Sequence, residues 1–143
     1  MATHKIFDAD GTYSIQDSAI GTKSIGWAPF EADAACEAGD GVVAFPIPAS
    51  MNGMNLINVV ATVTDKGVTG TMDVQIRRQR GAAEVDMLST KVTVGDEYFA
   101  QDGVVNTSND DVATGDQIFC DIDAIHSGTA ADGCSVIAEF RLP

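Results

Sequence analysis

Short runs in which apolar and polar residues alternate are the feature that most constrains how this chain can fold. Within Thr69–Arg78, for example, Met72, Val74 and Ile76 share one side and polar residues occupy the other. Such runs, separated by turn residues about every ten positions, predict β-strands with one buried face. Further strands are expected at Val42–Ile47, Asn55–Thr64, Val85–Leu88, Thr90–Val94, Gln117–Ile125 and Cys134–Leu142. The sequence therefore predicts an all-β fold, an antiparallel β-sandwich or jelly roll with an extended N-terminal arm.

The last two expected strands are joined by His126–Gly133, a loop rich in Ser, Gly, Thr and Ala. We expect these strands to form a C-terminal antiparallel hairpin whose apolar residues face the core. Residues 41–143 are assigned to the sandwich domain. Within it, residues 95–116 form the longest irregular stretch, and a loop of that length is usually functional or packs against a neighbour.

Residues 1–40 are assigned to the N-terminal arm or extension, with a short helical turn expected at Glu31–Glu37. The string GTYSI at Gly11–Ile15 is echoed by GTKSI at Gly21–Ile25. Two copies of five residues are too few for a repeat architecture. Two interpretations stay open: a chance result of turn-rich composition, or an arm of weak strands that packs on another chain.

The chain has 21 acidic and 8 basic residues, a formal net charge of −13. This excess of acid argues against binding to nucleic acid and to anionic membranes, which both require Lys and Arg. No apolar stretch is long enough for a membrane-spanning helix, and Met1–Gly11 lacks the apolar segment of a signal peptide. We therefore expect a cytosolic chain with Cys36, Cys120 and Cys134 reduced, a Cys120–Cys134 disulfide being the alternative.

Residues for catalysis are not evident in the sequence. His4 and His126 lack partners at a spacing typical of a metal site or a catalytic triad, and nucleophile motifs and phosphate loops are absent. The segment Asp8–Gly11 resembles the start of a calcium loop, but Tyr13 and Ala19 stand where that loop needs Gly and Glu. We therefore expect no enzyme activity, no catalytic residue, no cofactor and no metal site.

An acidic group in the long loop leaves one alternative open. Asn109, Asp110, Asp111 and Asp116 could form a solvated acidic loop or hold a hard cation. A hydrolase that uses this loop is the least favoured reading of the sequence.

Three arginines, Arg77, Arg78 and Arg80, form the only basic cluster, between two long stretches that lack Lys and Arg. They either balance nearby acids at a solvated strand end or contact an acidic partner, since Arg pairs bidentately with carboxylates. With Trp27 and Phe30 of the arm, they are our candidate interface residues.

Four strings carry a resemblance to a known class of proteins: VQIRR at 74–78, VDMLSTKVTV at 85–94, NDDVATGDQI at 109–118 and VIAEFRLP at 136–143. They resemble segments of small structural proteins of tailed bacteriophages, namely capsid decoration (cement) proteins, head fibres and tail-fibre-like virion proteins. The resemblance covers roughly residues 55–143. It implies a β-sandwich or jelly-roll module, usually trimeric, that assembles on a virion, and it transfers no catalytic or ligand residues.

The function expected from the resemblance is that of a structural protein that binds the outside of a phage capsid and stabilises it. Its partners would be the major capsid protein and further copies of itself, as a homotrimer, on a virion assembled in the host cytoplasm. The alternative is a receptor- or carbohydrate-binding module of a head or tail fibre. That module would need exposed aromatic rings, and its candidates are Trp27, Tyr98, Phe99 and Phe119.

Overall fold

The computed structural model describes residues 3–8, 11–16 and 21–143, and this part of the chain is almost entirely β. Its one helical element is a short 3-10 helix, η1, at Ala49–Met51. The strands are β1 Thr3–Asp8, β2 Gly11–Gln16, β3 Thr22–Trp27, β4 Gly39–Pro46, β5 Asn55–Thr62, β6 Met72–Arg80, β7 Ala83–Asp86, β8 Leu88–Thr90, β9 Val92–Val94, β10 Phe99–Ala100, β11 Val104–Val105, β12 Gln117–Ala124 and β13 Ser135–Arg141. The all-β class expected from the alternating runs is confirmed.

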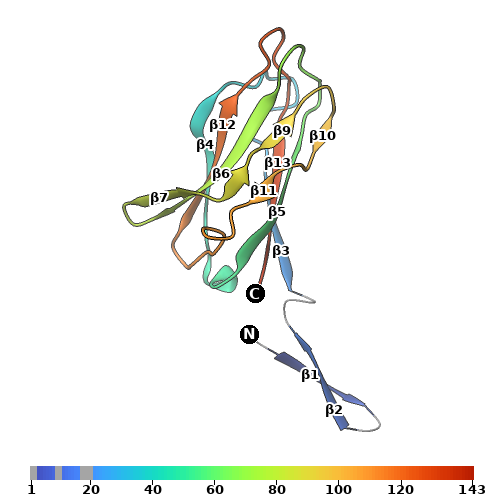
Figure 1. Ribbon diagram of the computed structural model, residues 1–143, viewed down its shortest axis with the longest axis vertical. Helices are drawn as coiled ribbons and strands as arrows, with labels where there is room; N and C mark the ends of the chain where they lie inside the picture. The colour runs from blue at the N-terminus through green and yellow to red at the C-terminus, as the bar shows by residue number, and fades with distance from the viewer. Residues whose placement is uncertain (1–2, 9–10, 17–20) are drawn as a thin grey trace.

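Two antiparallel sheets pack face to face (Figure 1). The first has the strand order β10-β5-β13-β3, and the second has the order β4-β12-β6-β7, with β9 also paired to β6. From β3 to β6 each successive strand lies in the opposite sheet, and β10, β12 and β13 alternate in the same way. This alternation is the connectivity of a double-sheet jelly roll, so the expected sandwich architecture is confirmed.

The expected hairpin between the last two strands is wrong. β12 lies between β4 and β6 in one sheet, whereas β13 lies between β3 and β5 in the other. An alternating pattern shows only that each strand has one apolar face directed to the core. Two strands with such faces can pair in one sheet, or they can face each other from opposite sheets. The long connection after Ala124 allows the chain to cross from one layer to the other.

The core lies between the inward faces of these two central strands. Val74 and Ile76 of β6 and Ile118 and Ile122 of β12 face inward from one sheet, and Phe140 of β13 faces inward from the other. All five are at most 1% exposed, and burial of a side chain of this size contributes about 1.5–3 kcal/mol. This burial is what holds the two layers together.

The boundary expected at residue 40 is also wrong, because part of the predicted arm belongs to the sandwich. β3 is an edge strand paired with β13, and Trp27 at its end is buried. The helical turn expected at Glu31–Glu37 is replaced by a turn closed by the Ala34 N–H and the Glu31 carbonyl, followed by a bridge from Ala35 to Asp132. Within the predicted arm, β1 and β2 stand apart as a separate two-stranded sheet that Figure 1 shows beyond the start of β3.

The long loop 95–116 is tied to the sandwich along much of its length. β10 pairs with β5, and β11 pairs with β8. Further on, the Leu56 N–H donates to the Asp110 carbonyl at 2.8 Å and the Val112 N–H donates to the Met54 carbonyl at 2.9 Å. The loop therefore extends the first sheet beyond the start of β5.

All three cysteines are free and buried. Cys120 and Cys134 face inward as expected, and the alternative Cys120–Cys134 disulfide is not formed. The neighbour of the Cys134 thiol is instead Cys36, and this neighbour raises the pKa of the Cys134 thiol.

Candidate functional site

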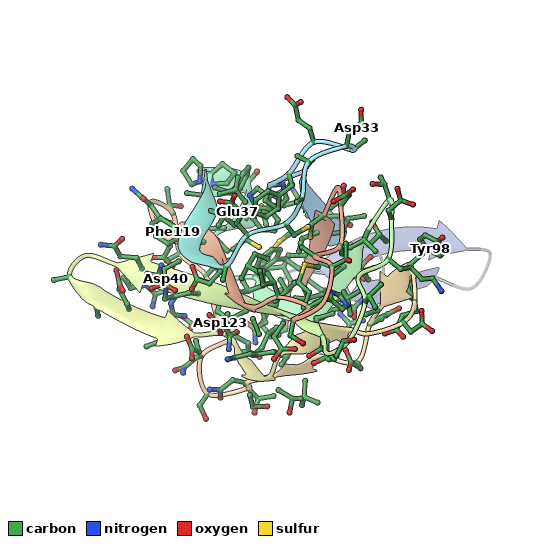
Figure 2. All side chains as sticks on the ribbon, turned by 90° about the horizontal axis from the view of Figure 1, so that it is seen from above. Asp33, Glu37, Asp40, Tyr98, Phe119 and Asp123 are labelled. Carbon is green, nitrogen blue, oxygen red and sulfur yellow. The ribbon has the colours of Figure 1, made fainter. Side chains whose placement is uncertain are left out.

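The second sheet carries an open acidic recess on its outer face, with a volume of about 450 Å³. Figure 2 shows Asp40, Phe119 and Asp123 on this side of the molecule and Tyr98 far from them. We call this site the acidic recess; its lining residues are Asp40, Gln75, Arg77, Glu84, Asp86, Asp121 and Asp123.

Arg77 is the basic residue of the recess. On β6 it lies opposite Phe119 of β12 and Asp86 of β7 in the strand register. Its Nε and Nη2 donate to the two carboxylate oxygens of Asp121 at 2.8 and 3.1 Å, and its Nη1 lies 2.8 Å from Glu84 Oε2. These hydrogen bonds to Asp121 raise the pKa of Arg77 well above its ordinary value. The guanidinium also lies over the Phe119 ring, 4.7 Å from its centroid, at cation–π distance.

Asp121 is buried because β4 passes close above it. The register of β12 against β4 shifts between Cys120 and Ile122, so Asp121 lies at an irregularity of the ladder. There its Oδ1 accepts the Gly41 N–H at 2.5 Å. Gly41 has a φ of 62°, in the left-handed region, and a Cβ at this position would lie 3.3 Å from the Phe119 ring. Glycine is favoured at this position, which brings the amide within reach of the carboxylate.

Gln75 lines the recess. Its side chain supplies hydrogen bonds at a point where this side of β6 lacks a paired strand. β6 pairs with β7 along one part and with β9 along another, and Gln75 lies between these two segments. Its amide nitrogen donates to the Leu88 carbonyl at 3.1 Å, and its oxygen accepts the Leu88 N–H at 3.1 Å and the Ile76 N–H at 2.9 Å. The side chain is therefore fixed, and it serves the structure of the sheet.

The recess keeps an excess of negative charge. Arg77 offsets Asp121 and Glu84, and Lys91 lies 2.7 Å from Asp123. Asp40 and Asp86 have no ion pair among the described residues. Within the described ranges no three His, Cys, Asp or Glu side chains are placed to hold a metal ion together. By its charge and shape, the recess can accept a basic side chain or an organic amine.

Arg78 and Arg80 form a second network, with the acids of the long loop. Arg78 is buried, and its Nη1 donates to the carbonyl and, at 2.6 Å, to Oδ1 of Asp111. Arg80 binds both oxygens of Asp116, at 2.9 and 2.7 Å, and lies 3.0 Å from Asp111. The hydrogen bond from Arg78 lowers the pKa of Asp111. Burial raises the pKa of Asp116, but the hydrogen bonds from Arg80 and the Ala113 N–H outweigh it and lower that pKa overall.

These contacts pair two acids of the long loop with cations of the same chain. The carboxylates of Asp111 and Asp116 are neutralised by arginines of β6, and Asp110 contributes its backbone carbonyl to the pairing with Leu56. The cations of this cluster are thus the guanidinium groups of the chain itself.

The structure separates the candidate interface residues into two groups. Arg77, Arg78 and Arg80 come together on β6, but each guanidinium is engaged within the chain, and only the Arg80 side chain keeps substantial exposure, at 43%. Trp27 is buried and packs edge-on against the Phe45 ring at 6.4 Å, and Phe30 is partly buried against the core. The arginine contacts fit the first of the two alternatives, in which the arginines balance acids of the same chain. An interface role for Arg77, Arg78, Arg80, Trp27 and Phe30 stays a prediction.

The aromatic residues proposed for a sugar platform are dispersed. Trp27 is buried, and the Phe119 ring is covered by Arg77. Tyr98 and Phe99 remain 54% exposed, with the Lys66 ammonium 5.4 Å from the Tyr98 ring centroid.

The two histidines have different outcomes. His4 belongs to β1, and the exposure of its side chain lies outside the described part of the structure. Its place at the start of a loop favours a solvated side chain for His126, but the ring is buried, and its Nε2 lies 3.2 Å from the Gly95 carbonyl oxygen. The ring packs directly on Gly67, where a Cβ would lie 2.1 Å from its Cγ.

Sequence reasoning missed the acidic recess as a site. Asp40, Gln75, Glu84 and Asp86 were not singled out, although Gln75 and Arg77 share the polar side of the alternating run. The missing information was the strand register, which places Gln75 opposite Asp121 and Arg77 opposite Asp86.

No protein-family model, no curated protein and no solved structure matches this chain. In the part of the chain that the structure describes, no helix combines the length and hydrophobicity needed to cross a membrane.

Proposed function

We propose that this protein is a structural component of a phage virion, a decoration protein that binds the outside of the capsid and stabilises it, without an enzymatic role. The observation that carries the proposal is the acidic recess, an exposed concave surface with surplus carboxylates on a rigid sheet. Such a surface can receive a basic side chain of a capsid subunit, and charge complementarity of this kind sets register and partner choice. The major capsid protein is the proposed partner, at the exterior of the virion.

Two further features support the proposal. The four strings that resemble phage structural proteins lie mainly on the strands of the jelly roll and in the loop that extends it. Arg77, Arg78 and Arg80 pair with acids of the same chain, and the chain as a whole keeps a net charge of −13. A strongly charged surface keeps such a protein soluble until it meets its partner.

Co-sedimentation with purified capsids tests this proposal. We expect the protein to pellet with capsids at low salt and to be released as the salt concentration rises, because the contact is between charges. Asp40→Lys should weaken binding, since it places a positive charge at the recess. Asp33→Lys is the matched control, because Figure 2 shows Asp33 away from Asp40, and it should leave binding nearly unchanged. Failure of the unmodified protein to bind capsids would overturn the proposal.

A second candidate function is a receptor- or carbohydrate-binding module of a fibre, and one observation favours it. Tyr98 and Phe99 are adjacent, exposed aromatic residues, which is the side-chain type that stacks on sugar rings. A glycan array should then give hits that are lost in Tyr98→Ala and Phe99→Ala. An array without hits removes this candidate.

A further inference from the structure

β3 presents a free edge at the side of the first sheet. It pairs with β13 in an uninterrupted register from Thr22↔Arg141 to Trp27↔Val136, and it is the last strand in the order of that sheet. The backbone groups on its other side have no strand partner among the described residues. A free edge of six residues is an open template for pairing with another strand.

Two other edges of the sandwich, at β10 and β4, are protected from such pairing. β10, at the opposite edge of the same sheet, has only two residues. β4, at the edge of the second sheet, contains Pro46 and a register shift against β12. Proline and bulges are devices that block pairing at sheet edges, and β3 has neither.

The chain also contains a pair of strands that lacks a sheet. β1 and β2 form a regular antiparallel hairpin with six paired positions, and among the described strands neither pairs with the sandwich. A two-stranded hairpin on its own is at best marginally stable in water, and a third strand is needed to stabilise it. Figure 1 shows this hairpin beyond the start of β3, away from both layers.

We propose that the hairpin of one copy pairs, through β2, with the free edge of β3 in a second copy of this chain. The exchange satisfies both incomplete elements, because it extends the sheet of one copy and gives the hairpin of the other a third strand. β2 and β3 are also closely matched in sequence, since GTYSI and GTKSI place Gly, Thr, Ser and Ile at corresponding positions. Exchange of an identical element between protomers is a low-cost route to oligomers.

The short connection explains why a neighbour is the partner. Five residues separate Gln16 at the end of β2 from Thr22 at the start of β3, and in extended form they span at most about 17 Å. With the hairpin directed away from its own sheet, this span reaches across a contact between two copies. Two copies can exchange hairpins reciprocally, or each copy can give its hairpin to the next copy in a closed ring. A ring of three copies is the trimer expected from the resemblance. The inference concerns copies of one chain and does not depend on capsid binding.

Light scattering coupled to gel filtration of the full-length protein, without capsids, tests the exchange. We expect an assembly of two or three copies. Tyr13→Pro and Ser14→Pro should each reduce the assembly to the monomer, because proline removes a hydrogen bond of the strand ladder. The N–H groups of adjacent residues point to opposite edges of β2, so one variant disrupts the pairing with β1 and the other the pairing with β3 of the second copy. Thr107→Pro is the matched control: Thr107 follows Asn106 in a tight turn where proline is favoured, so the assembly should persist.

Two further measurements separate exchange from a folding defect. Trp27 fluorescence should stay that of the native sandwich in both β2 variants, since the hairpin is outside it. Hydrogen exchange should show residues 11–16 and 22–27 protected in the assembly and less protected in the variants. A monomeric unmodified protein, including one whose hairpin folds back on its own β3, overturns the proposal. An assembly that survives both proline variants overturns it as well.

Discussion

Replacing Asp121 by Asn tests whether the ion pair at the acidic recess stabilises the fold. The Asp121 carboxylate accepts two hydrogen bonds from Arg77 and one from the Gly41 N–H. The asparagine side chain is uncharged. Its NH2 group replaces one acceptor oxygen and therefore faces the N–H groups of Arg77 or Gly41. Gly41 or Arg77 is then left with an unsatisfied buried group.

The magnitude follows from burial and from the remaining partners. Loss of one partner of a buried ion pair costs about 3–5 kcal/mol. Arg77 is 16% exposed and keeps Glu84 at 2.8 Å, so part of its charge stays compensated. We therefore expect the free energy of unfolding to fall by about 2–3 kcal/mol, near the lower limit of that range. For a domain of this size the melting temperature should fall by about 5–10 °C.

Urea unfolding followed by Trp27 fluorescence measures this change, with the midpoint expected to fall at constant slope. Asp123→Asn is the matched control, because Asp123 is exposed and pairs with Lys91 at the surface. Exposed pairs of this kind contribute about 0–1 kcal/mol, so the control should change little. If Asp121→Asn costs no more than Asp123→Asn, our assignment of the buried pair as a stabilising contact is refuted.

Three further predictions concern packing, pH and thiol reactivity. Gly67→Ala should destabilise the protein by about 3 kcal/mol in thermal unfolding, because the added methyl group overlaps the buried His126 ring. The free energy of unfolding should fall as the pH drops below about 4. Asp116 has a folded pKa below its ordinary value, so the stability from its contacts with Arg80 is lost as the pH falls through that pKa. Burial raises the pKa of the Cys120 thiol to about 12, so a thiol reagent at pH 8 should modify it only after unfolding by urea.

Each of these three has a control or an outcome that would contradict it. Gly26→Ala meets nothing closer than 3.9 Å and should leave the melting temperature nearly unchanged, so equal effects at the two glycines would contradict the packing argument. Asp116→Asn should give a flatter dependence of stability on pH between pH 4 and strong acid. An unaltered profile would show that other acids dominate. Rapid modification of the native thiols would contradict their burial.

The strands of the jelly roll could be predicted because alternation depends only on neighbouring residues. The run with Met72, Val74 and Ile76 therefore gave the correct buried face for β6. Which strands pair is decided by contacts between distant segments, and alternation does not report them. The hairpin expected between β12 and β13 was wrong for this reason.

The candidate site was harder to predict for a related reason. Arg77, Arg78 and Arg80 form an isolated basic cluster in the sequence, which left open whether they balance acids of the chain or contact a partner. Their acids, Asp111, Asp116 and Asp121, lie 33 to 44 residues later. Only the register of β6 against β12, and the return of the long loop along β5, bring these charges together.

The central place of β13 has a consequence for how the chain folds. Ile25 of β3 pairs with Ala138 of β13, 113 residues further along the chain, and β5 pairs with the same strand on its other side. During synthesis the first sheet therefore lacks its middle strand until residues 135–141 have emerged from the ribosome. Until then β3 and β5 have exposed edges, and chains at this stage are prone to aggregate. Because such distant pairings also carry a large loop-closure entropy, we expect folding of the released chain over milliseconds to seconds, at the slow end of the range for small domains.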